Sequence, residues 1–139
     1  MLTHFLLNSY TALLSSNDMR SVNLVILLGN ATRDAELHHT QTGKAVSSIR
    51  LATNRTINGT EETQFHTIVC WDKLAETTAE YVKKGDPLYV EGRLQYRTYQ
   101  DDEGKDRGVA EIVARDVQFL GRRRTESELD AITPNDVEA

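Results

Sequence analysis

The chain has 139 residues, 27% of them charged and 6% aromatic, and a formal net charge of −5. This length is typical of one domain with its own hydrophobic core, and a single cysteine excludes an internal disulfide and a cysteine metal cluster. Residues 125–139 contain five acidic residues and no basic ones. The rest is nearly neutral, so a nucleic-acid surface would need its cations clustered on one face.

Residues 1–18 are apolar with interspersed Ser, Thr and Asn, and Met19 stands directly before a strand-rich region. The segment has no basic start typical of a secretory signal and lacks the arginines of an organelle transit peptide. Its apolar run is far shorter than the roughly 20 residues that cross a membrane. We expect residues 1–19 to be a disordered leader or a mis-assigned start, and a short amphipathic helix over residues 1–18 is the alternative. We also expect a cytoplasmic location without membrane association, in preference to mitochondrial import.

Three strands are predicted before the helix. Residues 22–28 are almost continuously apolar, as in a central strand, and residues 34–40 look like a short continuation after a bend. Residues 44–54 and 64–71 form the second and third strands. The polar segment 57–63 between them has an Asn-Gly pair at its tip, which suits a hairpin.

Residues 73–84 carry an apolar stripe at helical spacing and form the predicted helix. Asp72 is its predicted N-cap, and Gly85 its predicted left-handed C-cap. Two strands at 87–99 and 109–120 follow, joined by an acidic hairpin tip. This order predicts an all-β fold, the five-stranded oligonucleotide-binding (OB-fold) barrel with one helix between strands 3 and 4.

The strand at 87–99 separates its side chains into two faces. One face is mainly apolar and can join a core: Leu88, Val90, Gly92, Leu94 and Tyr96. The other face carries Tyr89, Arg93, Arg97 and Tyr99 beside Glu91 and Gln95. Gly92 within the strand indicates a bulge or a bend. A basic, aromatic outer face is the main indication of function.

No constellation typical of an enzyme is present. The histidines lack the spacing of a helical zinc motif, and neither a Gly-rich phosphate loop nor a Gly-x-Ser-x-Gly elbow occurs. His38 and His39 would point to opposite faces of a strand, so no metal site is predicted. Cys70 lies in an apolar strand and is typical of a core thiol. We expect no catalytic residues, no enzymatic activity and no cofactor.

Flat rings beside cations suit an unpaired nucleic-acid strand, because bases stack on the rings and phosphates contact Lys and Arg. Stacking tolerates every base, so such binding is largely independent of sequence. The predicted stacking residues are Phe65, Trp71 and Tyr99, with Tyr89 and Tyr96 behind them. The predicted phosphate contacts are Lys44, Arg55, Lys73, Arg93, Arg97, Lys105 and Arg107. Pattern alone leaves core packing open for Phe65 and Trp71, and a solvated face open for Tyr99 and the arginines.

Several segments occur in the order of one family's landmarks. They are VNLVILLGN at 22–30, LAT at 51–53, FHTIV at 65–69, LAE at 74–76 with YVKKG at 81–85, and YVEGRL at 89–94. Together they resemble the bacterial-type single-stranded DNA-binding proteins over roughly residues 20–122. The resemblance implies an OB-fold barrel at 20–122 that assembles as a homotetramer and wraps single-stranded DNA.

The family's ring positions fall on Phe65, Trp71 and Tyr99, which are all aromatic here. A fourth family aromatic, in the loop after the second strand, falls near Ile57 and is missing. Lys73 matches a basic family position, and Arg97 lies in the basic run before Tyr99. His66 falls at a position that the family uses at the subunit interface.

Residues 123–139 are predicted to be a short acidic disordered tail. The chain ends in Asn-Asp-Val-Glu-Ala, whereas the family's usual acidic tip ends in Pro-Phe. Recruitment of repair and replication proteins through the tip is therefore undecided. The hypothesis is a nucleoid-associated protein that binds and protects single-stranded DNA in replication, recombination and repair. The alternatives are a primosome-type protein-interaction adaptor on the same barrel and an RNA-binding barrel.

Overall fold

Six strands and one helix follow one another along residues 20–121, the part of the chain that the computed structural model describes. They are β1 (Val25–Ala31), β2 (Glu36–His39), β3 (Ala45–Ile57), β4 (Thr60–Trp71), α2 (Asp72–Tyr81), β5 (Pro87–Gln100) and β6 (Asp106–Phe119). The predicted leader at 1–19 and the predicted tail at 123–139 lie outside the described residues.

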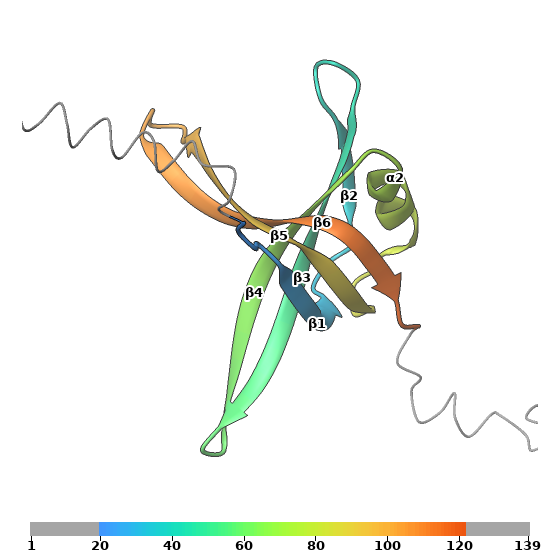
Figure 1. Cartoon of the computed structure of the whole chain (residues 1–139), viewed down its shortest axis with the longest axis vertical. Coiled ribbons are helices and arrows are strands. Elements are labelled where there is room, and N and C mark those ends of the chain that lie inside the picture. Colours follow the sequence, from blue (N-terminus) through green and yellow to red (C-terminus); the bar gives the residue numbers. More distant parts are fainter. Residues whose placement is uncertain (1–19, 122–139) are drawn as a thin grey trace, which may run out of the picture.

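Five of the strands close into a barrel in the order β1-β5-β6-β4-β3 (Figure 1). β1 pairs with β5 along its length and with β3 at its end, where Asn30 lies opposite Ala52. β4 and β6 pair in parallel, and the other neighbours are antiparallel. The helix stands between the third and fourth barrel strands. The predicted five-stranded OB-fold barrel is therefore confirmed.

The short segment predicted to continue the first strand is instead a separate strand, β2, which pairs with the start of β3. β1 itself lies three residues later than predicted. The β3–β4 hairpin turns on two residues, Asn58 and Gly59, with φ of 50° and 78°. Both are in the left-handed region that a tight two-residue hairpin turn requires, so the strands extend into the segment predicted as a polar loop.

The predicted helix caps are wrong. Trp71 occupies the N-cap position without a side-chain cap, and Asp72 lies inside the first turn with φ of 55°. The helix ends at Tyr81 because the backbone turns extended at Val82, whose side chain is fully buried in the core. Gly85, with φ of 91°, belongs to the turn that follows. Burial of the Val82 side chain in the core thus ends the helix earlier than the sequence periodicity predicts.

The barrel interior is filled by the inward side chains of its strands. The fully buried apolar ones are Ile49, Leu51, Ile68, Cys70, Leu88 and Val90. α2 covers one end of the barrel, where Thr78 Oγ1 lies 2.6 Å from Ser47 Oγ. Cys70 is a core thiol as predicted, and burial raises its pKa. Its thiolate is therefore disfavoured, and the thiol is not activated for chemistry.

The predicted separation of β5 into a core face and an outer face is correct inside the barrel, but beyond the barrel the predicted core face is exposed. Leu88 and Val90 are fully buried, and the β5–β6 register shifts between Glu91 and Gly92, at the predicted irregularity. A Cβ at Gly92 would collide with the backbone of the neighbouring strand. Tyr96 was predicted on the core face but is 78% exposed, because the β5–β6 hairpin projects beyond the barrel there (Figure 1).

Candidate nucleic-acid interface

The three predicted stacking rings share the outward face of one wall of the barrel, built by β3, β4, β6 and β5. Residues opposite one another on paired strands point to the same side. Val69 of β4 lies opposite Val113 of β6, so the outward faces of the two hairpins are continuous. Phe65, Trp71 and Tyr99 lie on this face and are 55%, 38% and 46% exposed. The core-packing alternative for Phe65 and Trp71 is therefore wrong.

Each of the three rings has a cation over it. Lys44 Nζ lies 5.8 Å from the centroid of Trp71, Arg50 Cζ 5.6 Å from that of Phe65, and Arg97 Cζ 5.9 Å from that of Tyr99. These separations fall within the range in which a cation is attracted to an aromatic face. The wall thus presents three pairs, each made of an aromatic ring and a cation. In this combination bases can stack on the rings while neighbouring cations contact phosphates.

Arg50 is a candidate that the sequence analysis missed. Its guanidinium donates a 3.0 Å hydrogen bond to Thr67 Oγ1, the residue opposite it on β4, which holds it beside Phe65. The Asn-Gly turn sets the β3–β4 register, and that register brings Arg50 and Phe65 together. Counting back from the turn would have found the pair in the sequence.

A groove of about 400 Å³ runs between the two hairpins on this wall. Trp71, Thr67 and Val69 line it from β4, and Arg97 and Glu111 line it from β5 and β6. Phe65 and Trp71 are six residues apart on one strand, a separation of roughly 20 Å. The wall is long enough for several nucleotides of an extended strand.

Lys44 and Lys73 flank a second, shallower hollow of about 350 Å³ beside Trp71. Lys44 comes from the turn before β3 and Lys73 from the first turn of α2. Asp72 and Glu76 also line this hollow, so its charge is mixed. The predicted cations Lys44 and Lys73 therefore line the same hollow at the Trp71 end of the wall.

The seven predicted cations form two groups, those with a carboxylate partner and those without one. Three are ion-paired: Arg55 with Glu62 at 2.6 Å, Arg97 with Glu111 at 3.1 Å, and Arg107 with Asp101 at 2.9 Å. The hydrogen bond from Arg107 also lowers the pKa of Asp101. Within residues 20–121 the other four have no carboxylate partner: Lys44, Lys73, Arg93 and Lys105.

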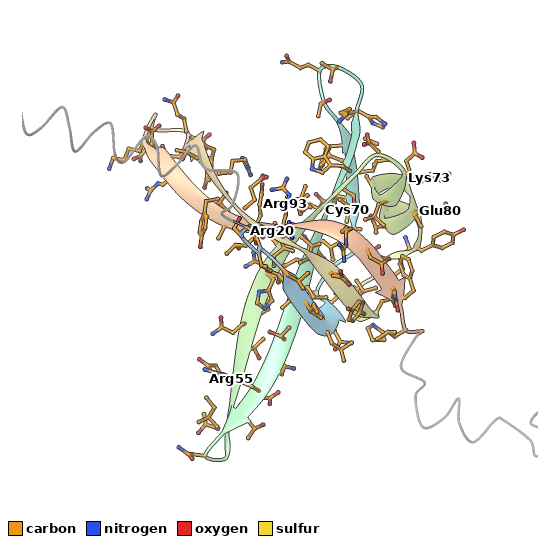
Figure 2. The ribbon with its side chains drawn as sticks, viewed as in Figure 1. Arg20, Arg55, Cys70, Lys73, Glu80 and Arg93 are labelled. Atoms are coloured by element: carbon orange, nitrogen blue, oxygen red, sulfur yellow. The ribbon has the colours of Figure 1, made fainter. Side chains whose placement is uncertain are left out.

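The structure does not bring all seven cations to the groove. Figure 2 shows Arg55 on the projecting β3–β4 hairpin, far from Lys73 at the start of α2. Arg107 lies opposite Tyr99 on the β5–β6 hairpin, and Lys105 is in its tip. Ile57, where the resemblance implies a fourth ring, lies at the end of β3 and is 44% exposed.

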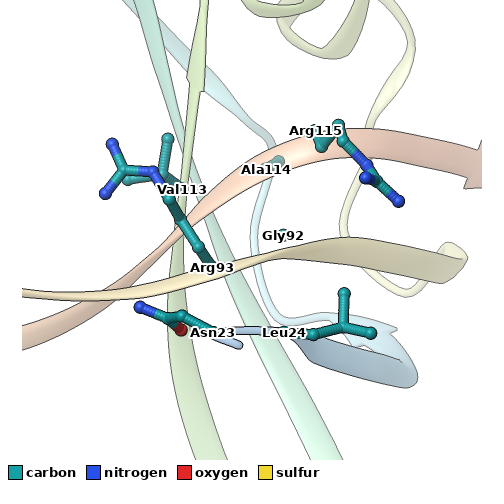
Figure 3. Close-up of a pocket in the computed structure, with 7 residues that line it drawn as sticks. All are labelled: Asn23, Leu24, Gly92, Arg93, Val113, Ala114 and Arg115. Carbon is teal, nitrogen blue, oxygen red and sulfur yellow. The ribbon is translucent and has the colours of Figure 1, made fainter. Parts of the chain in front are cut away.

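Arg93 lines a separate cavity of about 400 Å³ where β1 meets the irregular part of β5 (Figure 3). Asn23 fixes this corner, because its side-chain amide donates to the Leu94 carbonyl at 2.8 Å and accepts from the Leu94 amide at 2.9 Å. Arg93 and Arg115 point to different sides in this view. The guanidinium of Arg93 donates to Gln95 Oε1 at 3.1 Å.

His66 points to the opposite side of β4 from Phe65 and is partly buried. Its Nε2 lies 2.9 Å from Thr53 Oγ1. Burial first, and the charge of Arg50 second, lower the pKa of His66 below 6.5. The ring is therefore neutral at pH 7, which suits a contact with an apolar or uncharged partner.

Among residues 20–121, no group of three or more His, Cys, Asp or Glu side chains could hold a metal ion. Within the same residues, no helix has the length and apolar character to cross a membrane.

Comparison with known proteins identifies the family. The Single-strand binding protein family matches residues 22–120. The chain is 45% identical over 102 residues to "Single-stranded DNA-binding protein 2" of Listeria monocytogenes, covering 71% of this chain and 64% of that protein. It is 43% identical over 110 residues to "Single-stranded DNA-binding protein" of Halalkalibacterium halodurans, covering 77% of this chain and 66% of that protein.

A third relative, "Single-stranded DNA-binding protein" of Xanthomonas campestris, is 39% identical over 109 residues, covering 75% of this chain and 63% of that protein. The chain thus spans slightly less than two thirds of the length of these relatives. The matched region contains the whole barrel and all three rings. The chain therefore belongs to the single-strand binding protein family.

Proposed function

We propose that the chain is a non-enzymatic protein that binds single-stranded DNA without sequence preference and protects it in replication, recombination and repair. One observation carries the proposal: three exposed rings, each with a cation within 6 Å, lie on one continuous wall of an OB-fold barrel. Stacking contributes about 1–3 kcal/mol for each base, and it accepts any base. The relatives, which carry the name single-stranded DNA-binding protein, support the same function.

In this proposal, bases stack on Phe65, Trp71 and Tyr99 while the backbone follows the cations. Lys44, Lys73, Arg93 and Lys105 have no carboxylate partner in the described residues and are the readiest phosphate contacts. Arg55 and Arg107 belong to exposed ion pairs, which contribute little to stability. A phosphate can replace the carboxylate in such a pair, so both remain candidates, and Arg50 joins them at Phe65.

We further propose that the protein assembles as a homotetramer. β1 and the residues just before it expose a row of aliphatic side chains, here called the aliphatic face: Val22, Leu24, Ile26 and Leu28, which are 89%, 53%, 55% and 64% exposed. A contiguous exposed apolar row is typical of a protein–protein interface. His66, partly buried and neutral, is the second proposed interface residue. A cytoplasmic, nucleoid-associated location fits this function.

The test is binding of a fluorescent oligo-dT strand, with light scattering on the same sample to measure mass. We expect tight binding, little loss on changing to a mixed sequence, and an affinity that falls steeply with salt as counterions are released. Duplex DNA should compete poorly. Preference for a matched RNA strand would replace the proposal with the RNA-binding barrel. Failure to bind either strand would favour the protein-interaction adaptor.

A further inference from the structure

Glu111 is a buried carboxylate in the wall of the groove, 5% exposed. Both of its oxygens accept hydrogen bonds from Arg97, Oε1 from Nε at 3.1 Å and Oε2 from Nη2 at 3.3 Å. Gln95 Nε2 donates to Oε1 at 3.3 Å. The carboxylate is thus enclosed by Arg97 and Gln95, whose donors come from neighbouring positions on β5.

This pair differs from the other ion pairs on the hairpins. Glu62 and Asp101, the partners of Arg55 and Arg107, are partly exposed, so water can solvate them when a phosphate takes their arginine. Glu111 has almost no access to water. Releasing Arg97 would leave a buried charge without a partner, which is strongly unfavourable. Arg97 therefore stays with Glu111 when a strand binds.

The bidentate geometry also fixes the orientation of the guanidinium plane. Hydrogen bonding to Glu111, and then its charge, raise the pKa of Arg97. Arg97 Cζ lies 5.9 Å from the centroid of Tyr99. Bases stack on guanidinium planes as they do on aromatic rings. The Arg97 guanidinium over the Tyr99 ring thus offers a flat surface whose positive charge Glu111 already balances.

We propose that Glu111 is a positioning residue, which fixes the Arg97 guanidinium over the Tyr99 ring and balances its positive charge. Arg97 therefore stacks on a base and does not bind a phosphate. The inference rests on the proposed binding of single-stranded DNA. The cations of the wall then act in two ways. Lys44 and Lys73, at the Trp71 end, bind phosphates and contribute to the salt dependence. Arg97, at the Tyr99 end, binds through stacking and contributes little to the salt dependence.

The test is the slope of log affinity for oligo-dT against log salt, which changes by about 0.7 for each phosphate of a single strand that a side chain ceases to neutralise. Lys44→Gln is expected to reduce the slope by this amount. The double variant Arg97→Gln with Glu111→Gln removes both charges together and leaves no buried carboxylate without a partner. It is expected to weaken binding several-fold while the slope stays unchanged. A slope reduced as in Lys44→Gln would overturn the proposal.

Glu111→Gln alone supplies a second readout, because it frees the charge of Arg97 for a phosphate. The expected slope becomes steeper by about 0.7, which a merely structural role of Glu111 would not produce. An unchanged slope, in a variant that melts cooperatively, would contradict the proposal. If the unaltered chain fails to bind oligo-dT, the proposed function falls and this inference falls with it. A reduced slope in the double variant overturns the inference alone.

Discussion

The wall with the rings and the aliphatic face of β1 both expose large apolar side chains, but their surroundings differ. On the wall, each of Phe65, Trp71 and Tyr99 has a cation over its ring. On β1, Ile26 lies opposite Glu91, whose charge is already paired with Arg115. Exposure alone therefore does not identify a partner. Rings with cations over them suit nucleotides, whereas an aliphatic row beside balanced charges suits another protein surface.

The largest expected effect comes from placing a charge on the aliphatic face with Ile26→Glu. If β1 faces a second copy, the variant loses the burial of one side chain in each copy, about 3–6 kcal/mol per pair of copies. We expect the mass measured by light scattering to fall below that of a tetramer. Leu37→Glu, at an exposed aliphatic residue of β2, is the matched control and should leave the mass unchanged. A tetramer that survives Ile26→Glu would remove β1 from the interface.

The next effect concerns the wall. Replacing Phe65 and Tyr99 together by alanine removes two stacking surfaces and is expected to weaken binding of oligo-dT by about 2–6 kcal/mol. Mass and melting temperature should stay close to those of the unaltered chain, because both rings are exposed. Tyr96→Ala is the matched control, since Tyr96 lies on the same strand as Tyr99 and points to the other side. Equal losses in the two variants would count against a stacking wall.

The next prediction concerns Gly29, which lies where β1, the strand of the aliphatic face, meets β3, a strand of the wall. A Cβ there would collide with the carbonyl oxygen of Ala52, the residue opposite Phe65. Overpacking of this kind costs about 1–3 kcal/mol, so Gly29→Ala should lower the free energy of unfolding by that amount. Gly108→Ala, which meets nothing within 4 Å, is the control for denaturant unfolding. Equal stability of the two variants would mean that the crossing of β1 and β3 is not tightly packed.

The smallest effect is a pH dependence from His66, on the reverse side of β4 from Phe65. Its pKa is lowered in the folded state, so the unfolded chain binds the proton more readily. Stability is fully present above pH 6.5, the ordinary histidine value, and should decline as the pH falls below it. His66→Gln should remove this part of the decline in thermal melting. Superimposable pH profiles for the two proteins would show that His66 makes no such contribution.

Local patterns predicted much of this arrangement. Strict alternation along β4 separated Phe65 and Trp71 from Ile68 and Cys70, because successive side chains of a strand point to opposite faces. The order of strands and helix predicted the barrel. Alternation could not show where a strand leaves the barrel, which is why Tyr96 was assigned to the core.

The pairings that decide the chemistry of the wall depend on register between strands. Glu111 reaches Arg97 across 14 residues of hairpin, and Arg50 reaches Phe65 only through the pairing of β3 with β4. Composition shows that such charges exist, but it does not show which are paired. The helix end at Tyr81 was missed for a similar reason, since burial of Val82 overrides local helix propensity.

The most direct test of the central claim uses Trp71, the only tryptophan of the 139-residue chain. Its ring is partly exposed on the wall, with Lys44 over it. Titration with oligo-dT is expected to quench its fluorescence in step with binding, because a base stacks on the ring. Binding of oligo-dT with unchanged tryptophan emission would contradict the claim that this wall of the barrel holds the strand.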